Sequence, residues 1–228
     1  MCNTIYIFFS IFFLSLQTKM ASSFVEQIPT IIRLIQSLGP KRVLDIGKGF
    51  GKYGFLIHEY VGIDNLKRID PSKTLAELSN LKIDAVEADK DLMLPHLNQI
   101  YTTTFVGDVT KIYKDLPSFE LVLMIDVIEH LDKGSAVEVL KYFLELNTNI
   151  LIATPINYFQ QELYESDYEH HISHWKLKDF KALGIVESQY FGDGAVYLLS
   201  TRKLNLNNFG NSFYKKLKRI RRAILREI

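Results

Sequence analysis

The sequence has almost no cysteine and no long apolar run. Its one cysteine, Cys2, cannot form an intramolecular disulfide, which indicates a reducing compartment such as the cytoplasm. The apolar run at residues 5–16 is shorter than the roughly 20 residues that cross a bilayer. No Lys or Arg precedes this run and no small-residue cleavage site follows it, so it is a poor signal peptide.

These absences set the predicted division of the chain. The residues from Met20 onward are typical of the start of a cytosolic protein. We therefore interpret residues 1–19 as an apolar leader or as an upstream segment that is not native, and a signal peptide or a marginal membrane anchor is the alternative. With 47% hydrophobic and 23% charged residues, the chain can form one domain with a core, which we place at 20–204. Residues 205–228 form a separate C-terminal piece.

Basic residues gather in this C-terminal piece. Residues 212–228 hold seven of the 27 Lys and Arg but one of the 26 Asp and Glu, which leaves 20 basic against 25 acidic residues elsewhere. Apolar residues recur in the same stretch at helical spacing, which predicts a basic amphipathic helix. Three roles stay open for it: docking on the domain, lying on an anionic membrane surface, or contacting nucleic acid.

Short apolar runs alternate with helical patterns, which is typical of an α/β protein with a parallel sheet covered on both faces. Two further runs joined by Gly192 and Gly194 predict a terminal antiparallel hairpin. We therefore expect a Rossmann-like, doubly wound, mostly parallel sheet of seven strands. The predicted strands lie within 42–47, 83–88, 103–109, 119–127, 149–155, 184–191 and 195–202, and the predicted helices within 28–38, 52–60, 72–81 and 134–146.

The turn after the first predicted strand is rich in glycine, in the stretch DIGKGFGKYG. Gly47, Gly49 and Gly51 lack Cβ atoms, so the backbone can approach a ligand at the carboxyl end of the strand. The same stretch can be parsed as G-x-G-x-x-G ending at Gly54, which is the dinucleotide pattern. That alternative needs an acidic residue about 20 positions on; Asp70 is so placed but has no convincing strand before it. A tight turn without a ligand is the third interpretation.

Acidic residues around the turn favour one cofactor. Asp45 lies inside the strand, where its carboxylate can face the ammonium of a bound amino acid, whereas a pyrophosphate would gain nothing from it. Asp108 follows the third strand, and MIDVIEH ends the fourth. On these motifs and their order, residues 29–203 resemble the class I S-adenosylmethionine-dependent methyltransferases. The resemblance implies an enzyme with S-adenosylmethionine as cofactor.

The resemblance also assigns cofactor contacts. Glu87 matches the residue that binds the ribose hydroxyls, with Asp64 as a rival, and Asp108 matches the residue near the adenine. Lys48 departs from the family pattern, in which a small residue or Cys is common, and we assign it no role from the sequence. The full predicted cofactor-binding set is Asp45, Gly47, Gly49, Phe50, Gly51, Glu87, Asp108, Val109 and Asp126.

The DVIEH segment predicts a second cluster. A helical turn would place Asp126, Glu129 and His130 on one side, where they could hold a divalent cation, position a general base, or form only a local hydrogen-bond set. A similar acidic-x-x-Glu-His pattern occurs in ubiquinone-biosynthesis O-methyltransferases and small-RNA 2′-O-methyltransferases, where it binds Mg²⁺. That resemblance implies a Mg²⁺ site at these three residues, with Asp in place of the usual Glu at the first position.

The segment DYEHHISHW at 167–175 holds three of the six histidines and the only Trp. It follows the fifth strand, where similar enzymes place an acceptor loop. We predict His130, His171 and His174 as catalytic residues, with one of them removing the proton of an acceptor oxygen. Trp175 either walls the acceptor pocket or belongs to the core.

The predicted function is a cytoplasmic S-adenosylmethionine-dependent O-methyltransferase acting on a small-molecule, glycan or lipid-linked acceptor. Contact with a membrane surface through the C-terminal helix is compatible with it. An RNA 2′-O-methyltransferase is an alternative, although the acidic body argues against a broad nucleic-acid surface. An NAD(P)-dependent oxidoreductase and a non-catalytic binding domain are the others.

Overall fold

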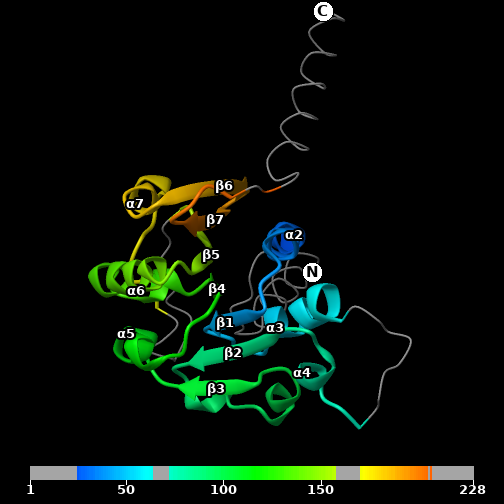
Figure 1. The fold of residues 1–228 in the computed structure, drawn as a ribbon. Coiled ribbons are helices and arrows are strands. Elements are labelled where there is room, and N and C mark those ends of the chain that lie inside the picture. The colour runs from blue at the N-terminus through cyan, green and yellow to red at the C-terminus, as the bar shows by residue number, and fades with distance from the viewer. Residues whose placement is uncertain (1–24, 64–71, 158–169, 205, 207–228) are drawn as a thin grey trace, which may run out of the picture.

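The computed structural model describes residues 25–63, 72–157, 170–204 and 206 (Figure 1). The predicted leader at 1–19, the predicted helix within 205–228, Asp64 and Asp70 lie outside these residues. No helix in the described ranges has the length and apolar character needed to cross a membrane.

The described residues form one seven-stranded sheet with the order β3-β2-β1-β4-β5-β7-β6. The first five strands are parallel, and β7 runs antiparallel to both β5 and β6. This arrangement confirms the predicted α/β, mostly parallel sheet with a terminal hairpin. The strands are β1 (Arg42–Ile46), β2 (Lys82–Glu87), β3 (Thr103–Val106), β4 (Leu121–Ile125), β5 (Asn149–Pro155), β6 (Ile185–Phe191) and β7 (Gly194–Ser200).

Helices cover both faces of the sheet, with α2 and α3 on one side and α5, α6 and α7 on the other (Figure 1). The α-helices are α2 (Ile28–Leu38), α3 (Lys52–Ile57), α4 (Leu75–Leu78), α5 (Val109–Ile112), α6 (Lys133–Glu145) and α7 (Leu177–Lys181). The short 3₁₀ helices are η1 (Val25–Gln27), η4 (Lys90–Leu92), η5 (Pro95–Gln99), η6 (Tyr113–Asp115) and η7 (Ile128–His130), and η2 (His58–Gly62) is a π-helical turn.

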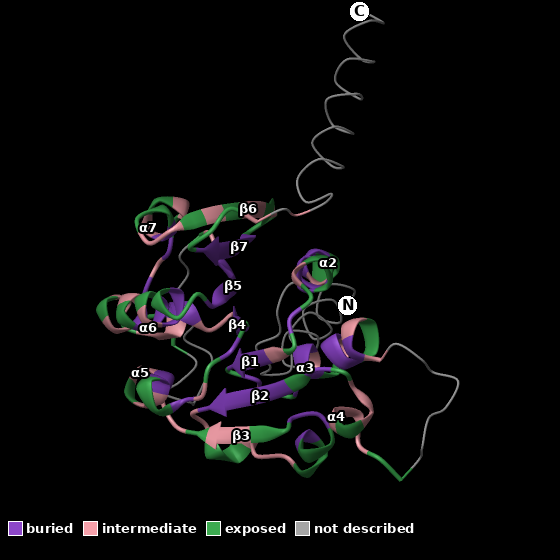
Figure 2. Cartoon of the chain, in the orientation of Figure 1, coloured by how far each residue is buried: buried purple, intermediate pink, exposed green. Residues whose placement is uncertain are grey.

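The central strands are buried on both faces because helices pack on each side. Every residue of β4, β5 and β7 is buried, whereas the edge strands β3 and β6 are only partly covered (Figure 2). One core lies between the sheet and α6, and the other lies between the sheet and α2. This sandwich is why the strands read as continuous apolar runs instead of alternating patterns.

Two predicted helices are shorter than the sequence pattern suggests. The helix expected over 52–60 ends as α3 at Ile57 and continues as η2, where the buried His58 places Nε2 2.7 Å from the Ile100 carbonyl oxygen. The helix expected within 72–81 is the single turn α4, which begins with a capping box between Thr74 and Glu77. In both places tertiary contacts and caps, not periodicity, set the helix ends.

Candidate functional site

The candidate site lies where the strand order reverses, between the carboxyl ends of β1 and β4. The glycine turn follows β1, and the DVIEH segment follows β4, which is the neighbouring strand. A Cβ atom at Gly47 would collide with the Val127 side chain, so the two loops are in direct contact. Ligands of open α/β sheets bind at this position.

The glycine turn has a backbone that only glycine adopts readily. Gly47, Gly49 and Gly51 have φ angles of 68°, 48° and 81°. The Gly49 amide donates to Glu87 Oε2 over 3.1 Å, and the Asp89 amide donates to Glu87 Oε1 over 3.1 Å. Both oxygens of the predicted ribose-binding carboxylate are therefore oriented by backbone amides at the mouth of the turn.

Asp45 lies beneath the turn and is buried. The Tyr101 hydroxyl donates to its Oδ2 over 2.6 Å. The pKa of Asp45 is raised to about 7, mainly by burial: the Tyr101 hydrogen bond lowers it, Glu87 adds to the rise, and the Lys48 ammonium lowers it. Near neutral pH this carboxyl group therefore gains or loses its proton easily, and a cationic ligand group would favour the ionised form.

Three more of the predicted cofactor residues follow β1 and β3. Asp108 caps α5, with Oδ1 accepting from the Thr110 amide over 2.9 Å. Burial opposes ionisation of Asp108, but hydrogen bonds from Thr110 and Lys111 outweigh it, so its pKa is lowered. Val109 is buried in the core, whereas Phe50 is half exposed at the turn, where a ligand can cover it.

Asp126 begins the DVIEH segment with a left-handed backbone. Its φ is 53°, which is unusual for a non-glycine residue, and its amide donates to the Ala153 carbonyl over 2.9 Å. Both carboxylate oxygens are shielded from solvent, and neither accepts a hydrogen bond from the described residues. Burial raises the pKa of Asp126 to about 6, with Lys52 lowering it.

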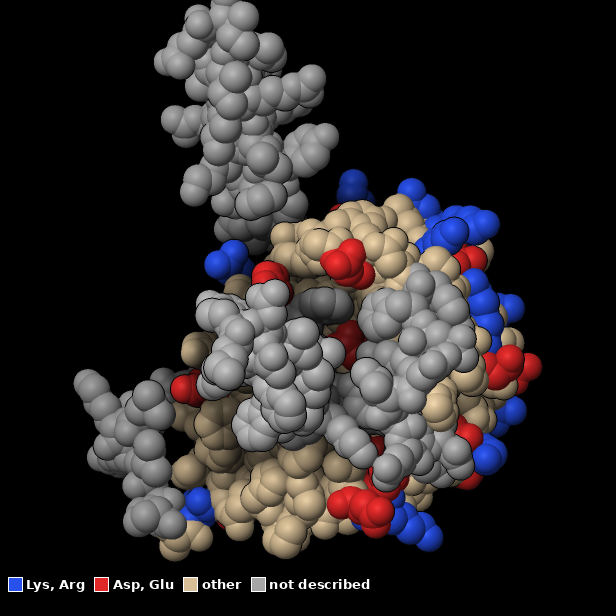
Figure 3. Space-filling model, turned by 180° about the vertical axis from the view of Figure 1, so that it is seen from behind, with Lys and Arg blue, Asp and Glu red and all other residues tan. Residues whose placement is uncertain are grey.

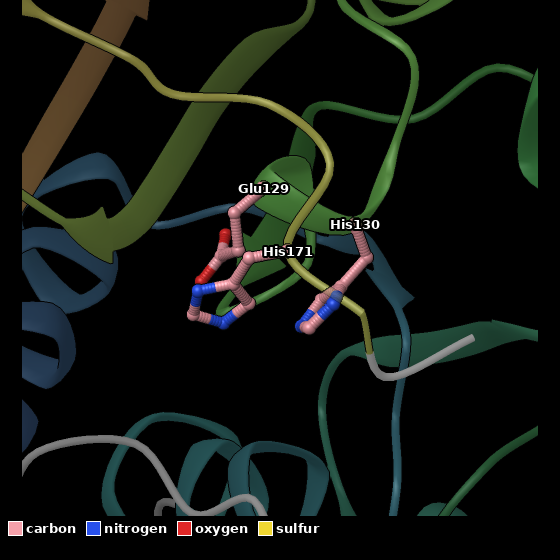
Figure 4. A group of neighbouring side chains, drawn as sticks. All are labelled: Glu129, His130 and His171. Carbon is pink, nitrogen blue, oxygen red and sulfur yellow. The ribbon is translucent and has the colours of Figure 1, made fainter. Parts of the chain in front are cut away.

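Three other side chains, Glu129, His130 and His171, form a cluster that could hold a metal ion (Figure 4). One ligand atom from each lies within 4.8 Å of the others. The first two side chains come from η7, and His171 comes from the segment after β5. The cluster differs from the predicted set in having His171 in place of Asp126, because the helical turn begins only at Ile128.

Backbone hydrogen bonds hold the histidine segment on η7. The Glu129 carbonyl accepts from the Ile172 and Ser173 amides, each over 2.9 Å. The Ser173 hydroxyl donates to the Ile128 carbonyl over 3.0 Å. These bonds bring His171 beside Glu129, which the sequence separation alone does not indicate.

Two predicted side chains of this segment lie away from the cluster. Trp175 is buried, donates to the Ile128 carbonyl over 3.1 Å and stacks on Phe180, so it belongs to the core and does not wall a pocket. His174 places Nε2 2.8 Å from the Ile156 carbonyl oxygen and is not in the cluster. Of the predicted catalytic histidines, the structure brings together His130 and His171.

The surroundings of His130 favour a neutral imidazole. The pKa of His130 is lowered to about 4, mainly by burial. Its hydrogen bond to the His170 carbonyl raises the pKa, and the neighbouring His171 and His170 lower it. That bond, 3.1 Å from Nδ1, requires Nδ1 to carry the hydrogen, which leaves Nε2 as the acceptor or ligand atom. The Thr154 hydroxyl donates to Glu129 Oε2 over 3.0 Å and orients the carboxylate.

The donor set tests the predicted Mg²⁺. Mg²⁺ prefers oxygen ligands, whereas imidazole nitrogens suit transition metals. One carboxylate and two imidazoles therefore fit a divalent transition metal better than Mg²⁺. Sequence reasoning also missed the residues that support the site, Tyr101, Thr154 and Ser173, because nothing in their local sequence shows which carboxylate or carbonyl they reach.

Solved structures, but no sequence families, resemble this chain. No protein-family model matches the sequence, and no curated protein matches it. The methyltransferase domain of the bacterial protein CtHen1 has a similar structure, with a TM-score of 0.51 and 18% identity, over 78% of this chain and 100% of that domain.

Two other solved structures are similar. An O-methyltransferase family protein from Burkholderia thailandensis gives a TM-score of 0.52 at 10% identity, over 77% of this chain and 56% of the other. Small RNA methyltransferase HEN1 gives 0.56 at 15% identity, over 82% of this chain but 27% of that one, so this chain spans only a fraction of its length. With its strand order and terminal hairpin, the chain has the fold of the class I S-adenosylmethionine-dependent methyltransferases.

Proposed function

We propose that the protein is an S-adenosylmethionine-dependent O-methyltransferase. The observation that carries the proposal is the Glu87 carboxylate, which is held by the Gly49 and Asp89 amides at the rim of the glycine turn. A carboxylate fixed there suits the two hydroxyls of a ribose, which donate hydrogen bonds to it. Phe50, exposed beside it, offers a surface for the adenosyl group.

The same geometry disfavours a dinucleotide. In a dinucleotide site, amides at the helix end of the glycine turn face the pyrophosphate. Here the Gly49 amide already donates to a carboxylate, and Asp45 lies beneath the turn, so a pyrophosphate would meet negative charge. The methionine end of the cofactor carries an ammonium group, which suits Asp45 and the shielded Asp126 carboxylate.

The chemistry that we propose is an in-line displacement. The acceptor oxygen bonds to the methyl carbon while the carbon–sulfur bond breaks, and the sulfur keeps that electron pair in S-adenosylhomocysteine. The hydroxyl proton passes from the acceptor to solvent water. The protein mainly aligns the two reactants. Glu129, His130 and His171 lie at the same edge of the sheet as the glycine turn, which supports a role for them in positioning the acceptor hydroxyl.

We further propose that this cluster holds a divalent transition metal. A bound cation would make the acceptor hydroxyl more acidic and hold it in place. With a pKa of about 4, His130 is neutral at pH 7 and thus competent as a ligand, whereas it is too weakly basic to retain a proton as a general base. Thr154 orients the Glu129 carboxylate for the same purpose.

For the acceptor we propose a small molecule, a glycan or a lipid-linked group. On the face drawn in Figure 3, acidic groups are interspersed among basic ones over the described residues, which does not suit a phosphate backbone. RNA 2′-O-methylation is the second candidate, because one of the structurally similar proteins is a small RNA methyltransferase. Contact with a membrane surface through residues 212–228 also remains a proposal.

Calorimetry with S-adenosylmethionine, S-adenosylhomocysteine, NAD and NADP tests the cofactor. We expect binding of the two adenosyl sulfur compounds and none of the dinucleotides; the opposite result would overturn the proposal. Transfer of labelled methyl groups to catechols, sugars and RNA 3′ ends, with and without added Mn²⁺, then identifies the acceptor class. A preference for RNA that weakens steeply with salt would favour the second candidate.

A further inference from the structure

Lys48, in the middle of the glycine turn, is buried although its neighbours are at the surface. Its exposed fraction is 5%, while Gly47 and Phe50 are exposed. Lysine is almost never this buried unless its ammonium has partners. Its Nζ donates to the Leu92 carbonyl over 2.8 Å, which ties the glycine turn to η4, the 3₁₀ helix after β2.

The segment after β2 packs along the whole glycine turn. His96 Nε2 lies 3.3 Å from the Phe50 carbonyl oxygen. A Cβ at Gly51 would run into Leu97 and contact Ile100, so η5 lies directly on the turn. Apolar packing thus fixes the η5 end of the segment, and the Lys48 hydrogen bond holds the η4 end.

Three carboxylates also act on Lys48 electrostatically. Burial lowers its pKa, while Glu87, Asp45 and Asp89 act in the opposite direction by favouring the ammonium form. Asp45 faces a negative group, Glu87, a positive group, Lys48, and the Tyr101 hydroxyl. Two carboxylates close together oppose each other's ionisation, and a cation between them relieves this.

We propose that Lys48 is a positioning residue of the cofactor site: its ammonium group fastens η4 across the glycine turn and offsets the charge of Glu87, so that Asp45 can be ionised when a cationic cofactor group binds. The inference rests on the proposed function and deepens it. A small residue at position 48 could not make the hydrogen bond to the Leu92 carbonyl that holds η4 on the glycine turn.

The test compares two variants. Lys48→Met keeps the length of the side chain but removes the charge, and Lys48→Arg keeps the charge. Lys90→Met is the matched control, because Lys90 is an exposed lysine on η4 itself. S-adenosylhomocysteine binding is measured by calorimetry from pH 5.5 to 8.5, and amide hydrogen exchange follows residues 89–92 without ligand.

For Lys48→Met we expect binding that is about tenfold or more weaker, since a charge-assisted hydrogen bond is lost. We also expect the pH midpoint of binding to move upward and the amides of 89–92 to exchange faster. Lys48→Arg should keep the midpoint within a few tenths of a pH unit, and Lys90→Met should match the wild type. Should Lys48→Met not fold, Lys48→Gln and Lys48→Arg give the same comparison.

The outcomes separate the two proposals. If the wild-type protein does not bind S-adenosylhomocysteine, the proposed function fails, while faster exchange in Lys48→Met would still support the fastening role. If the wild type binds and Lys48→Met has the same affinity and midpoint, the inference about Lys48 is wrong. Weaker binding with an unchanged midpoint and unchanged exchange would instead indicate a direct ligand contact, and would also overturn it.

Discussion

The Gly49 amide donates a hydrogen bond to Glu87 Oε2 over 3.1 Å and so joins the turn after β1 to the end of β2. In dinucleotide-binding glycine turns, a backbone amide of this kind faces the anionic pyrophosphate. It also fixes the orientation of Glu87, whose second oxygen accepts from the Asp89 amide. The proposed preference for S-adenosylmethionine over a dinucleotide rests on this pairing, because the turn presents a carboxylate instead of a set of donors.

Glu87→Gln should weaken cofactor binding. In this variant the side-chain NH₂ group would point at one of the two backbone N–H groups, or the site would lose one acceptor for the ribose hydroxyls. The negative charge of the carboxylate would also be lost. We expect S-adenosylhomocysteine affinity to fall about tenfold or more, measured by calorimetry. Glu138→Gln, an exposed change on α6, should leave affinity unaltered; equal affinity in both variants would remove Glu87 from the site.

Asp45→Asn should change how stability depends on pH. Burial raises the pKa of Asp45 from 3.8 to about 7, so between these values the unfolded chain releases a proton that the folded protein keeps. The free energy of unfolding therefore falls as the pH rises through this window, by an amount on the order of 4 kcal/mol, and is level above it.

Urea unfolding between pH 4 and 8 measures this effect. As the pH rises through this window, the free energy of unfolding of Asp45→Asn should increase relative to that of the wild type. The free energy of unfolding of the exposed variant Asp115→Asn should follow the wild type. A constant difference between the wild type and Asp45→Asn would contradict the raised pKa.

Gly47→Ala should destabilise the protein more than Gly192→Ala. Both glycines have left-handed φ angles, 68° and 52°, so both substitutions strain the backbone by about 1–2 kcal/mol. Only the Cβ at position 47 also collides with a neighbour, Val127, which adds about 1–3 kcal/mol. Thermal unfolding measures the difference in stability between the two variants. Adding Val127→Ala to Gly47→Ala should restore the stability lost to the collision but not the stability lost to backbone strain.

His171→Ala and His174→Ala should distinguish the proposed metal site from the histidine beside it. His171 contributes a ligand atom to the cluster, whereas the His174 ring lies against the Ile156 carbonyl. We expect Mn²⁺ affinity, followed by electron paramagnetic resonance, to be lost in His171→Ala and to change by less than about threefold in His174→Ala. Equal affinities in the two variants would mean that no metal binds through His171.

Much of the fold was predictable from local patterns. The apolar runs at β1, β4 and β5 are buried on both faces and need no partner-specific information to be recognised as strands. The helix ends were less predictable, since α3 changes to η2 where His58 reaches the Ile100 carbonyl, a contact between distant parts of the chain. Periodicity does not encode such a contact.

The sequence by itself determined the sheet, the glycine turn and the presence of Glu129 and His130 after β4. Only the tertiary structure decided how the cluster is completed. The left-handed Asp126 precedes the helical turn and breaks the predicted i, i+3, i+4 spacing. His171 joins instead, because backbone amides of its own segment bind the Glu129 carbonyl. Lys48 likewise acquires a role only when η4 folds over it, because its partner is a backbone carbonyl, a group that every residue carries and that the sequence therefore cannot distinguish.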